Sequence, residues 1–143
     1  MKNWEDISAE SELLALQEIK KSFDSGDLTD AEEGLTILIE SMSRSDRRAL
    51  ESQLIRLMLH VIKWKIQPDK RSRSWANSIR NARYEIKSWK KYSPALNDDF
   101  LRKIWQESLE EALSEAEIET GATTHHITDL TWEDVFETPY LIK

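Results

Sequence analysis

Cysteine is absent from this chain of 143 residues, which excludes disulfides, thiolate metal sites and thiol nucleophiles. Glycine and proline occur three times each, and such a composition favours helices. The most apolar stretch, residues 54–66, is interrupted by Arg56, His60, Lys63 and Lys65, so we expect no membrane span. The first residues lack the apolar segment of a signal peptide. These absences predict a cytoplasmic protein that does not enter a membrane.

Recognisable catalytic motifs are also missing. The sequence contains no phosphate-binding loop, nucleophile elbow or zinc-protease motif. Of three histidines, His125 and His126 are adjacent, a spacing that rarely chelates one ion, and no third ligand is near. We therefore expect no cofactor and no metal, and the sequence favours a protein without enzymatic activity.

Apolar residues at helical spacing dominate what is present. They predict an all-α fold, a single-domain bundle of about five helices over residues 1–143. The first predicted helix covers residues 8–23, and Thr29 with Glu32 forms a capping box for the second. Ser45 is the expected N-cap of the third.

Proline and glycine mark the later boundaries. Pro68 should end the third helix, because an interior proline removes a hydrogen bond. The short link to a fourth helix at residues 74–91 predicts a central antiparallel hairpin. The fifth helix should begin at Pro94 and end before Gly121.

Each predicted helix has one apolar stripe. The stripes of the first two helices are Leu13, Leu16, Ile19 and Phe23, then Leu28, Ala31, Leu35, Leu38 and Met42. The third contributes Leu50, Leu54, Leu57, Met58, Val61 and Ile62. The last two contribute Trp75, Ile79, Ala82, Ile86 and Trp89, then Leu101, Ile104, Trp105, Leu109, Ala112 and Ala116. In the less regular tail, residues 122–143, Thr131 should cap a short turn, with Trp132, Phe136 and Tyr140 packed on the bundle.

Charge is distributed unevenly along the chain. The net charge is −7, yet residues 44–103 carry 16 basic and six acidic side chains. Helical spacing predicts a basic contact face on the fourth helix: Arg80, Arg83, Lys87, Lys90 and Lys91. This face suits a phosphate backbone or an acidic protein, and it equally suits pairing with glutamates of the fifth helix or of a second copy.

The start of the fourth helix has an unusual charge. Arginine there faces the positive end of the helix dipole, where acidic residues are favoured, and such departures often mark function. We therefore consider an anion site at this point: Lys70, Arg71, Ser72, Arg73 and Ser74. Its occupant is either an external anion such as phosphate or a carboxylate of this chain.

A motif spans the end of the third helix and the link: His60, Lys63, Trp64, Gln67, Pro68 and Trp75. His60 could act as a general base, but a structural histidine bonded to a backbone group or an acid is the simpler interpretation. Most of the six tryptophans fall on or beside core stripes, which favours packing over stacking with single-stranded nucleic acid.

This central segment resembles a known bacterial family. The matching elements are His60-Val-Ile-Lys63-Trp64, Gln67-Pro68, Arg71-Ser72-x-Ser74-Trp75, and Ile79 with Arg83. The resemblance covers residues 28–121, and the tail at 131–141 is similar. The family, frequent in photosynthetic bacteria, is catalogued as domain of unknown function twenty-nine. The resemblance implies an all-helical bundle and no established activity.

Three functions fit these features. We expect a non-enzymatic interaction or regulatory module that binds a protein partner, or self-associates, through its basic central surface. The first alternative is a nucleic-acid-binding protein. The second is an enzyme for a phosphorylated substrate that uses His60 and the helix start at Arg71–Ser74.

Overall fold

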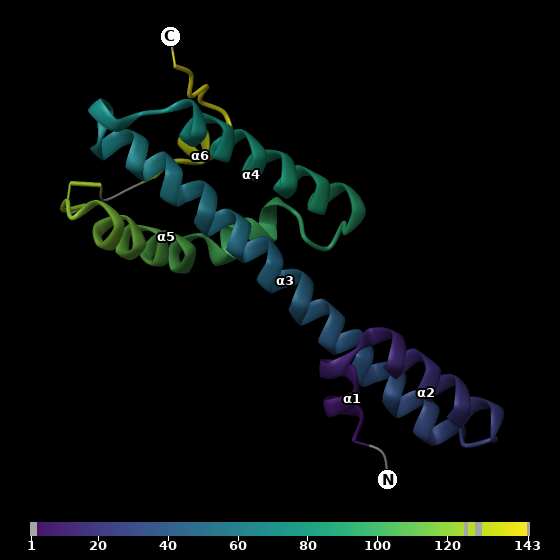
Figure 1. The fold of residues 1–143 in the computed structure, drawn as a ribbon. Helices are drawn as coiled ribbons and strands as arrows, with labels where there is room; N and C mark the ends of the chain where they lie inside the picture. Colours follow the sequence, from purple (N-terminus) through teal and green to yellow (C-terminus); the bar gives the residue numbers. More distant parts are fainter. Residues whose placement is uncertain (1–2, 125, 128–129, 143) are drawn as a thin grey trace. The chain divides into compact units, whose positions relative to one another are not determined.

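The fold is all-α, as the sequence predicts. A computed structural model describes residues 3–124, 126–127 and 130–142, and this part contains helices and no strand (Figure 1). None of its helices has the length and apolar character needed to cross a lipid bilayer. The chain divides into two compact units, Met1–Arg48 and Ala49–Lys143, and each is described here by itself.

The first unit contains α1 (Trp4–Glu10), α2 (Glu12–Asp24) and the beginning of α3 (Leu28–Ile66). The prediction of a single helix at residues 8–23 is wrong, because Ser11 adopts an extended conformation and separates α1 from α2. Its hydroxyl accepts a hydrogen bond from the backbone N–H of Leu14 at 3.2 Å, which caps α2.

Trp4 joins α1 to α3. Its indole is almost fully buried and lies on Gly34, where an added Cβ would stand 2.8 Å from three carbons of the ring. The indole N–H donates to the Asp30 carboxylate at 2.9 Å, and the hydroxyl of Ser22, on α2, donates to the same carboxylate at 2.7 Å. Gly34 therefore weakens the helix locally but allows α1 to approach α3 closely.

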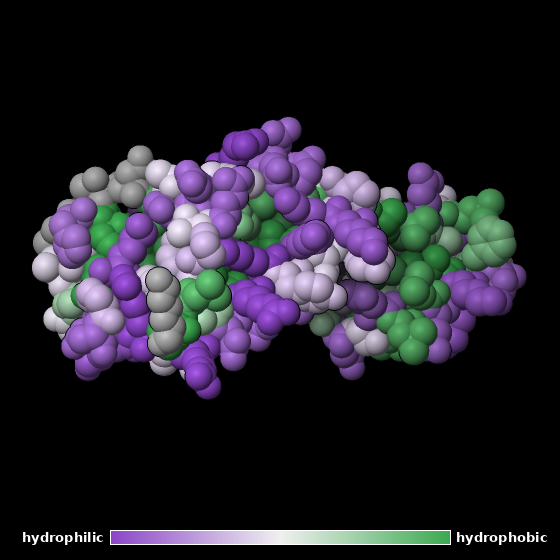
Figure 2. All heavy atoms as spheres, turned by 90° about the horizontal axis from the view of Figure 1, so that it is seen from above, coloured by the Kyte–Doolittle hydropathy of each residue, from purple (hydrophilic) through white to green (hydrophobic). Residues whose placement is uncertain are grey.

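Much of the predicted apolar surface of this unit is exposed. Ala31 and Leu38 are buried as expected, whereas six residues of the two predicted stripes are exposed: Leu13, Leu16, Phe23, Leu28, Leu35 and Met42. Ile39, which was not assigned to a stripe, is exposed as well. Figure 2 shows apolar side chains on the surface of this unit. The predicted burial is therefore wrong at six positions, because helical spacing identifies an apolar face without saying what covers it.

The helix α3 is continuous where the sequence predicts two helices. Ser45 is an exposed residue within it, so its assignment as an N-cap is wrong. The capping box at Thr29 is also wrong, because the helix begins at Leu28 and the Asp27 carboxylate, two residues before Thr29, accepts from the backbone N–H of Asp30. Without glycine or proline between residues 42 and 49, nothing in the backbone interrupts the helix.

The second unit is built on the end of α3, with α4 (Arg73–Tyr92) and α5 (Asp98–Thr120) on either side of it (Figure 1). The predicted stripe of α3 is completely buried, and Ile79, Ala82 and Ile86 of α4 pack on it. The 3₁₀ turn η1 (Pro68–Lys70) connects α3 to α4 and confirms the predicted hairpin.

Two details of α5 and its ends can be compared with the sequence. The helix begins at Asp98 behind the N-cap Asn97, so the expected start at Pro94 is wrong and Pro94 lies in the preceding turn. Gly121 has a φ of 70°, the left-handed conformation predicted for the residue after the helix.

The tail packs on the second unit through aromatic residues, as predicted. Thr131 and Asp134 form a capping box for α6 (Trp132–Phe136). Trp132 stacks on Trp105 with 5.5 Å between ring centroids, and Tyr140 meets Trp64 edge to face at 5.5 Å.

We predict that Gly34→Ala destabilises the protein in urea unfolding followed by circular dichroism. Alanine favours a helix by about 1 kcal/mol over glycine, but overpacking against Trp4 costs about 1–3 kcal/mol. In a Trp4→Ala background the same substitution should instead be stabilising, since the ring is gone. Equal effects of Gly34→Ala in both backgrounds would contradict the contact.

Candidate interaction surface

The motif residues form the corner between α3 and α4. A helix continued through residue 68 would donate its N–H to the carbonyl of Trp64, and Pro68 has no N–H. The Nε of Arg71 donates to this carbonyl instead, at 2.8 Å. Its guanidinium also lies over the Trp64 indole, 5.1 Å from the ring centroid. Arg71 thus replaces the donor that proline removes.

The residues around the corner are held by contacts within the second unit. The Ser72 hydroxyl accepts from the backbone N–H of Trp75 at 3.2 Å and caps α4. The Lys63 ammonium lies 4.9 Å from the Trp75 ring centroid and pairs with Glu119 at 3.0 Å. Gln67 is the residue before η1, and its carbonyl accepts from the N–H of Lys70 at 3.0 Å.

His60 is a partly buried residue with a local hydrogen-bond partner. Its Nδ1 lies 2.9 Å from the carbonyl oxygen of Arg56. Burial lowers the pKa of His60 from its usual 6.5, because the charged imidazolium is poorly solvated there. Among the residues that the structure describes, no group of three His, Asp or Glu could hold a metal ion. His126 is exposed, and His125 lies outside the described residues.

The five residues considered as an anion site divide into two groups. Arg71 and Ser72 are engaged with the chain itself, and Lys70, Arg73 and Ser74 are exposed. Within the described ranges no carboxylate pairs with Arg71; its partner is a carbonyl oxygen. The unusual charge at the start of α4 thus has a structural explanation at Arg71 and none at Arg73.

Arg83 turns toward the tail. Its Nε donates to the Val135 carbonyl at 2.7 Å and its Nη2 to the Asp134 carbonyl at 3.3 Å. The guanidinium lies 5.3 Å from the Tyr140 ring centroid, and the Tyr140 hydroxyl donates to the Asp134 carbonyl at 2.7 Å. Arg83 therefore fastens the tail to α4 and is not an outward contact.

A line of basic residues remains on the exposed side of α4. Arg73, Arg80 and Lys87 follow one another at intervals of seven residues, two helical turns, and Lys91 is one turn further. All four are exposed, and within the described part of the chain none forms an ion pair, whereas Lys90 pairs with Asp98 at 2.7 Å. We call Arg73, Arg80, Lys87 and Lys91 the basic stripe.

Tyr84 lies within the basic stripe. It follows Arg80 by one turn, and 67% of its surface is exposed. Of the contact face predicted from the sequence, Arg83 and Lys90 make internal contacts instead. Arg73 and Tyr84, which were not assigned to that face, are exposed on it. The spacing of seven residues from Arg80 would have placed Arg73 on this face. The spacing of four residues from Arg80 would have placed Tyr84 on it.

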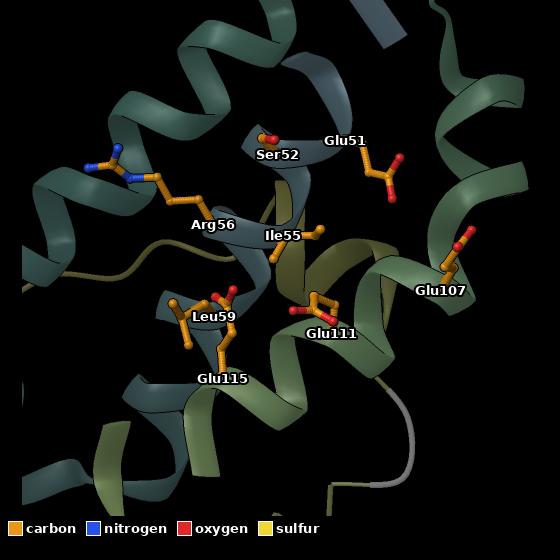
Figure 3. A pocket seen from close by; sticks show the side chains of 8 residues that line it. All are labelled: Glu51, Ser52, Ile55, Arg56, Leu59, Glu107, Glu111 and Glu115. Carbon is orange, nitrogen blue, oxygen red and sulfur yellow. The ribbon is translucent and has the colours of Figure 1, made fainter. Parts of the chain in front are cut away.

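An acidic groove lies between α3 and α5. It has a volume of about 490 Å³, and Ile55 and Leu59 line it together with four glutamates: Glu51, Glu107, Glu111 and Glu115 (Figure 3). Arg56 also lines it, but its side chain extends toward α4, away from the carboxylates. Three of the α5 glutamates that were candidates to neutralise the basic stripe, Glu107, Glu111 and Glu115, therefore line this groove against α3, and Glu110 does not.

Comparison with known proteins identifies the family. The profile of the family described as "Domain of unknown function DUF29" matches residues 12–141. The chain belongs to this family, which confirms the resemblance noted in the sequence. No curated protein and no solved structure matches the chain.

We predict that Arg83→Ala and Arg80→Ala differ sharply in their effect on stability. Each hydrogen bond from a charged group contributes about 1.5–3 kcal/mol, so Arg83→Ala should lower the free energy of unfolding by about 2–3 kcal/mol. Arg80→Ala removes the same type of side chain from an exposed site of the same helix. It should change the free energy of unfolding by less than about 0.5 kcal/mol. Equal losses in denaturant titrations would contradict the two roles.

Proposed function

We propose that this member of the DUF29 family is a non-enzymatic interaction or regulatory module that acts in the bacterial cytoplasm. Its partner is a protein with an acidic surface, and the contact is the basic stripe of α4. The observation that carries the proposal is a line of four exposed cations, over five helical turns, without a neutralising carboxylate in the described part of the chain.

Uncompensated like charges support this role. Arg73, Arg80, Lys87 and Lys91 repel one another along one side of α4, and an anionic partner relieves this repulsion and accelerates association. The pattern is local, since the net charge of the chain is −7. The two neighbouring cations that fasten the structure, Arg83 and Lys90, have partners of their own. The stripe is thus distinguished from the structural cations of the same helix.

The distribution of charge favours a protein partner over nucleic acid. The second unit also carries the acidic groove of Glu51, Glu107, Glu111 and Glu115, which a long phosphate backbone would have to avoid. A folded acidic protein can contact the stripe alone. The complete absence of cysteine is compatible with a reducing compartment such as the cytoplasm.

Nucleic-acid binding is the second candidate, and Tyr84 supports it. An exposed aromatic ring between cations offers a base a stacking surface. The enzyme hypothesis has less support, because the His60 ring already contacts the Arg56 carbonyl and the Ser72 hydroxyl is used to cap α4.

We predict that Arg80→Glu abolishes capture of an acidic protein from nuclease-treated lysate of the cells that make this protein. The immobilised wild-type chain should retain that partner, and increasing salt should release it. Lys103→Glu is the matched control, since it makes the same change of charge at an exposed position of α5 and should leave capture intact.

The outcomes separate the candidates. If nuclease removes the captured material, or if a labelled single-stranded oligonucleotide binds and Arg80→Glu and Tyr84→Ala both weaken it, the nucleic-acid function replaces the proposal. If Arg80→Glu and Lys103→Glu behave alike, the basic stripe is not the contact.

A further inference from the structure

We propose that the first unit binds the phosphate group of a small molecule in a cavity lined by residues of α1, α2 and α3. The cavity has a volume of about 620 Å³, and every residue that lines it belongs to this unit. We call it the phosphate cavity. It is a different place from the basic stripe of α4, and this inference does not rest on the proposed function.

The observation that carries the proposal is a buried hydroxyl without a partner. Ser8 is 4% exposed, and among the described residues nothing forms a hydrogen bond with its Oγ. Ser8 lines the phosphate cavity. A hydroxyl that loses water and gains no partner is unfavourable, and native proteins seldom keep one without a reason. The oxygen of a ligand in the cavity gives this hydroxyl an acceptor.

Helix geometry places the cavity beside the contact of α1 with α3. Ser8 follows Trp4 by one turn, so it lies on the side of α1 that packs on Gly34 of α3. On α3, Ser41, Ser45 and Arg48 follow Gly34 by seven, eleven and fourteen residues, which keeps them on the same face. The cavity therefore continues the face of α3 on which the Trp4 ring lies.

Two arginines of α3 supply positive charge to the cavity. Arg44 and Arg48 both line it, are one turn apart and are exposed. Within the described part of the chain neither forms an ion pair. Like charges at this spacing repel one another, and the guanidinium is the cation whose geometry best matches a phosphate. A bound phosphate relieves this repulsion.

The beginning of α2 adds donors from the backbone. Ser11, which lines the cavity, is the N-cap of this helix of thirteen residues. The N–H groups of Leu14 and Ala15 donate to Ser11, so among the described residues those of Glu12 and Leu13 remain for a ligand. These groups and the helix dipole favour an anion at this end of α2.

The arrangement of donors favours a phosphate over a carboxylate. Hydroxyls of Ser8, Ser41 and Ser45, two guanidiniums and the backbone of α2 come from three helices. A phosphate group presents its oxygens in several directions, whereas a carboxylate presents two oxygens in one plane. Sites for small molecules have volumes of about 300–1,000 Å³, so the cavity also has room for an organic part.

Two exposed glutamates, Glu10 and Glu12, also line the cavity. Their charge opposes an anion, but in the described part of the chain neither pairs with Arg44 or Arg48. Carboxylates accept hydrogen bonds from hydroxyl and amino groups. The ligand class that fits all these side chains is therefore a small phosphate ester whose organic part carries such groups.

The test is a titration of the isotope-labelled full-length protein with inorganic phosphate, followed through its amide signals by NMR. Millimolar phosphate should shift the signals of Glu12 and Leu13 until they saturate. Glycerol phosphate and phosphoethanolamine should bind the same amides more tightly than inorganic phosphate, because the glutamates accept from their organic parts. Glycerol and ethanolamine alone should leave Glu12 and Leu13 unchanged.

Four single variants identify the side chains that hold the phosphate. Ser8→Ala and Arg48→Gln should each raise the dissociation constant for inorganic phosphate about tenfold. Ser108→Ala and Arg47→Gln are the matched controls and should keep the wild-type constant. Ser108 is also a buried hydroxyl without a partner among the described residues, and Arg47 donates to the Ser43 carbonyl; neither lines the cavity.

Thermal unfolding separates ligand binding by Ser8 from a structural role. Without phosphate, Ser8→Ala should be at least as stable as the wild type, because it removes an unsatisfied buried hydroxyl. With phosphate, the wild type should gain stability by mass action and Ser8→Ala should gain less. Glu10→Gln/Glu12→Gln should tighten inorganic phosphate, since repulsion is removed, and should abolish the advantage of the two esters.

Three results would overturn the proposal: amide signals of Glu12 and Leu13 that do not respond to millimolar phosphate, equal effects of Ser8→Ala and Ser108→Ala on its binding, or equal effects of Arg48→Gln and Arg47→Gln. Esters that bind no more tightly than inorganic phosphate would overturn the ligand class. Arg80→Glu should leave the response of Glu12 and Leu13 unchanged, so the phosphate cavity and the basic stripe can fail independently.

Discussion

A single backbone carbonyl, that of Trp64, is the constraint on which the second unit depends. Pro68 ends α3 and deprives this oxygen of its helical donor, and the guanidinium of Arg71 supplies a charged donor at 2.8 Å while lying over the Trp64 ring. A charged donor to a partly buried carbonyl is among the stronger hydrogen bonds in proteins. It fixes where the chain turns, and therefore where α4 begins.

The surface chemistry of the second unit follows from that turn. Once α4 starts at Arg73, the helix period sends Ile79 and Ile86 into the core and Arg83 toward the tail, where it donates to two carbonyl oxygens. Within the residues that the structure describes, the cations that remain outside have no partner of this kind. A helix that looks uniformly basic in sequence is thus divided into cations that hold the fold and cations available to another molecule, such as Arg80.

Prediction from the sequence succeeded where local spacing determines which side chains are buried. It failed where contacts between residues distant in the sequence determine the structure. Spacing predicted the core of α4, and Pro68 predicted the corner. Ser45 resembles an N-cap, but a cap requires the backbone to leave the helix, and no local residue makes it do so. Trp4 contacts Gly34, which is thirty residues away in the sequence. The only indication of this contact in the sequence is an isolated glycine within a predicted helix. The donor role of Arg71 was detectable in principle, because a proline four residues after Trp64 leaves that carbonyl without a partner.

The most direct test of this account is a double-mutant cycle between Arg71→Ala and Pro68→Ala, measured by urea unfolding. With proline present, loss of the guanidinium leaves the Trp64 carbonyl without a donor and should cost about 1–3 kcal/mol. With alanine at position 68, a backbone N–H can reach that carbonyl, and the cost of Arg71→Ala should fall by about 1 kcal/mol. Additive effects, within about 0.3–0.5 kcal/mol, would show that Arg71 does not replace the missing donor, and the account of the corner would be wrong.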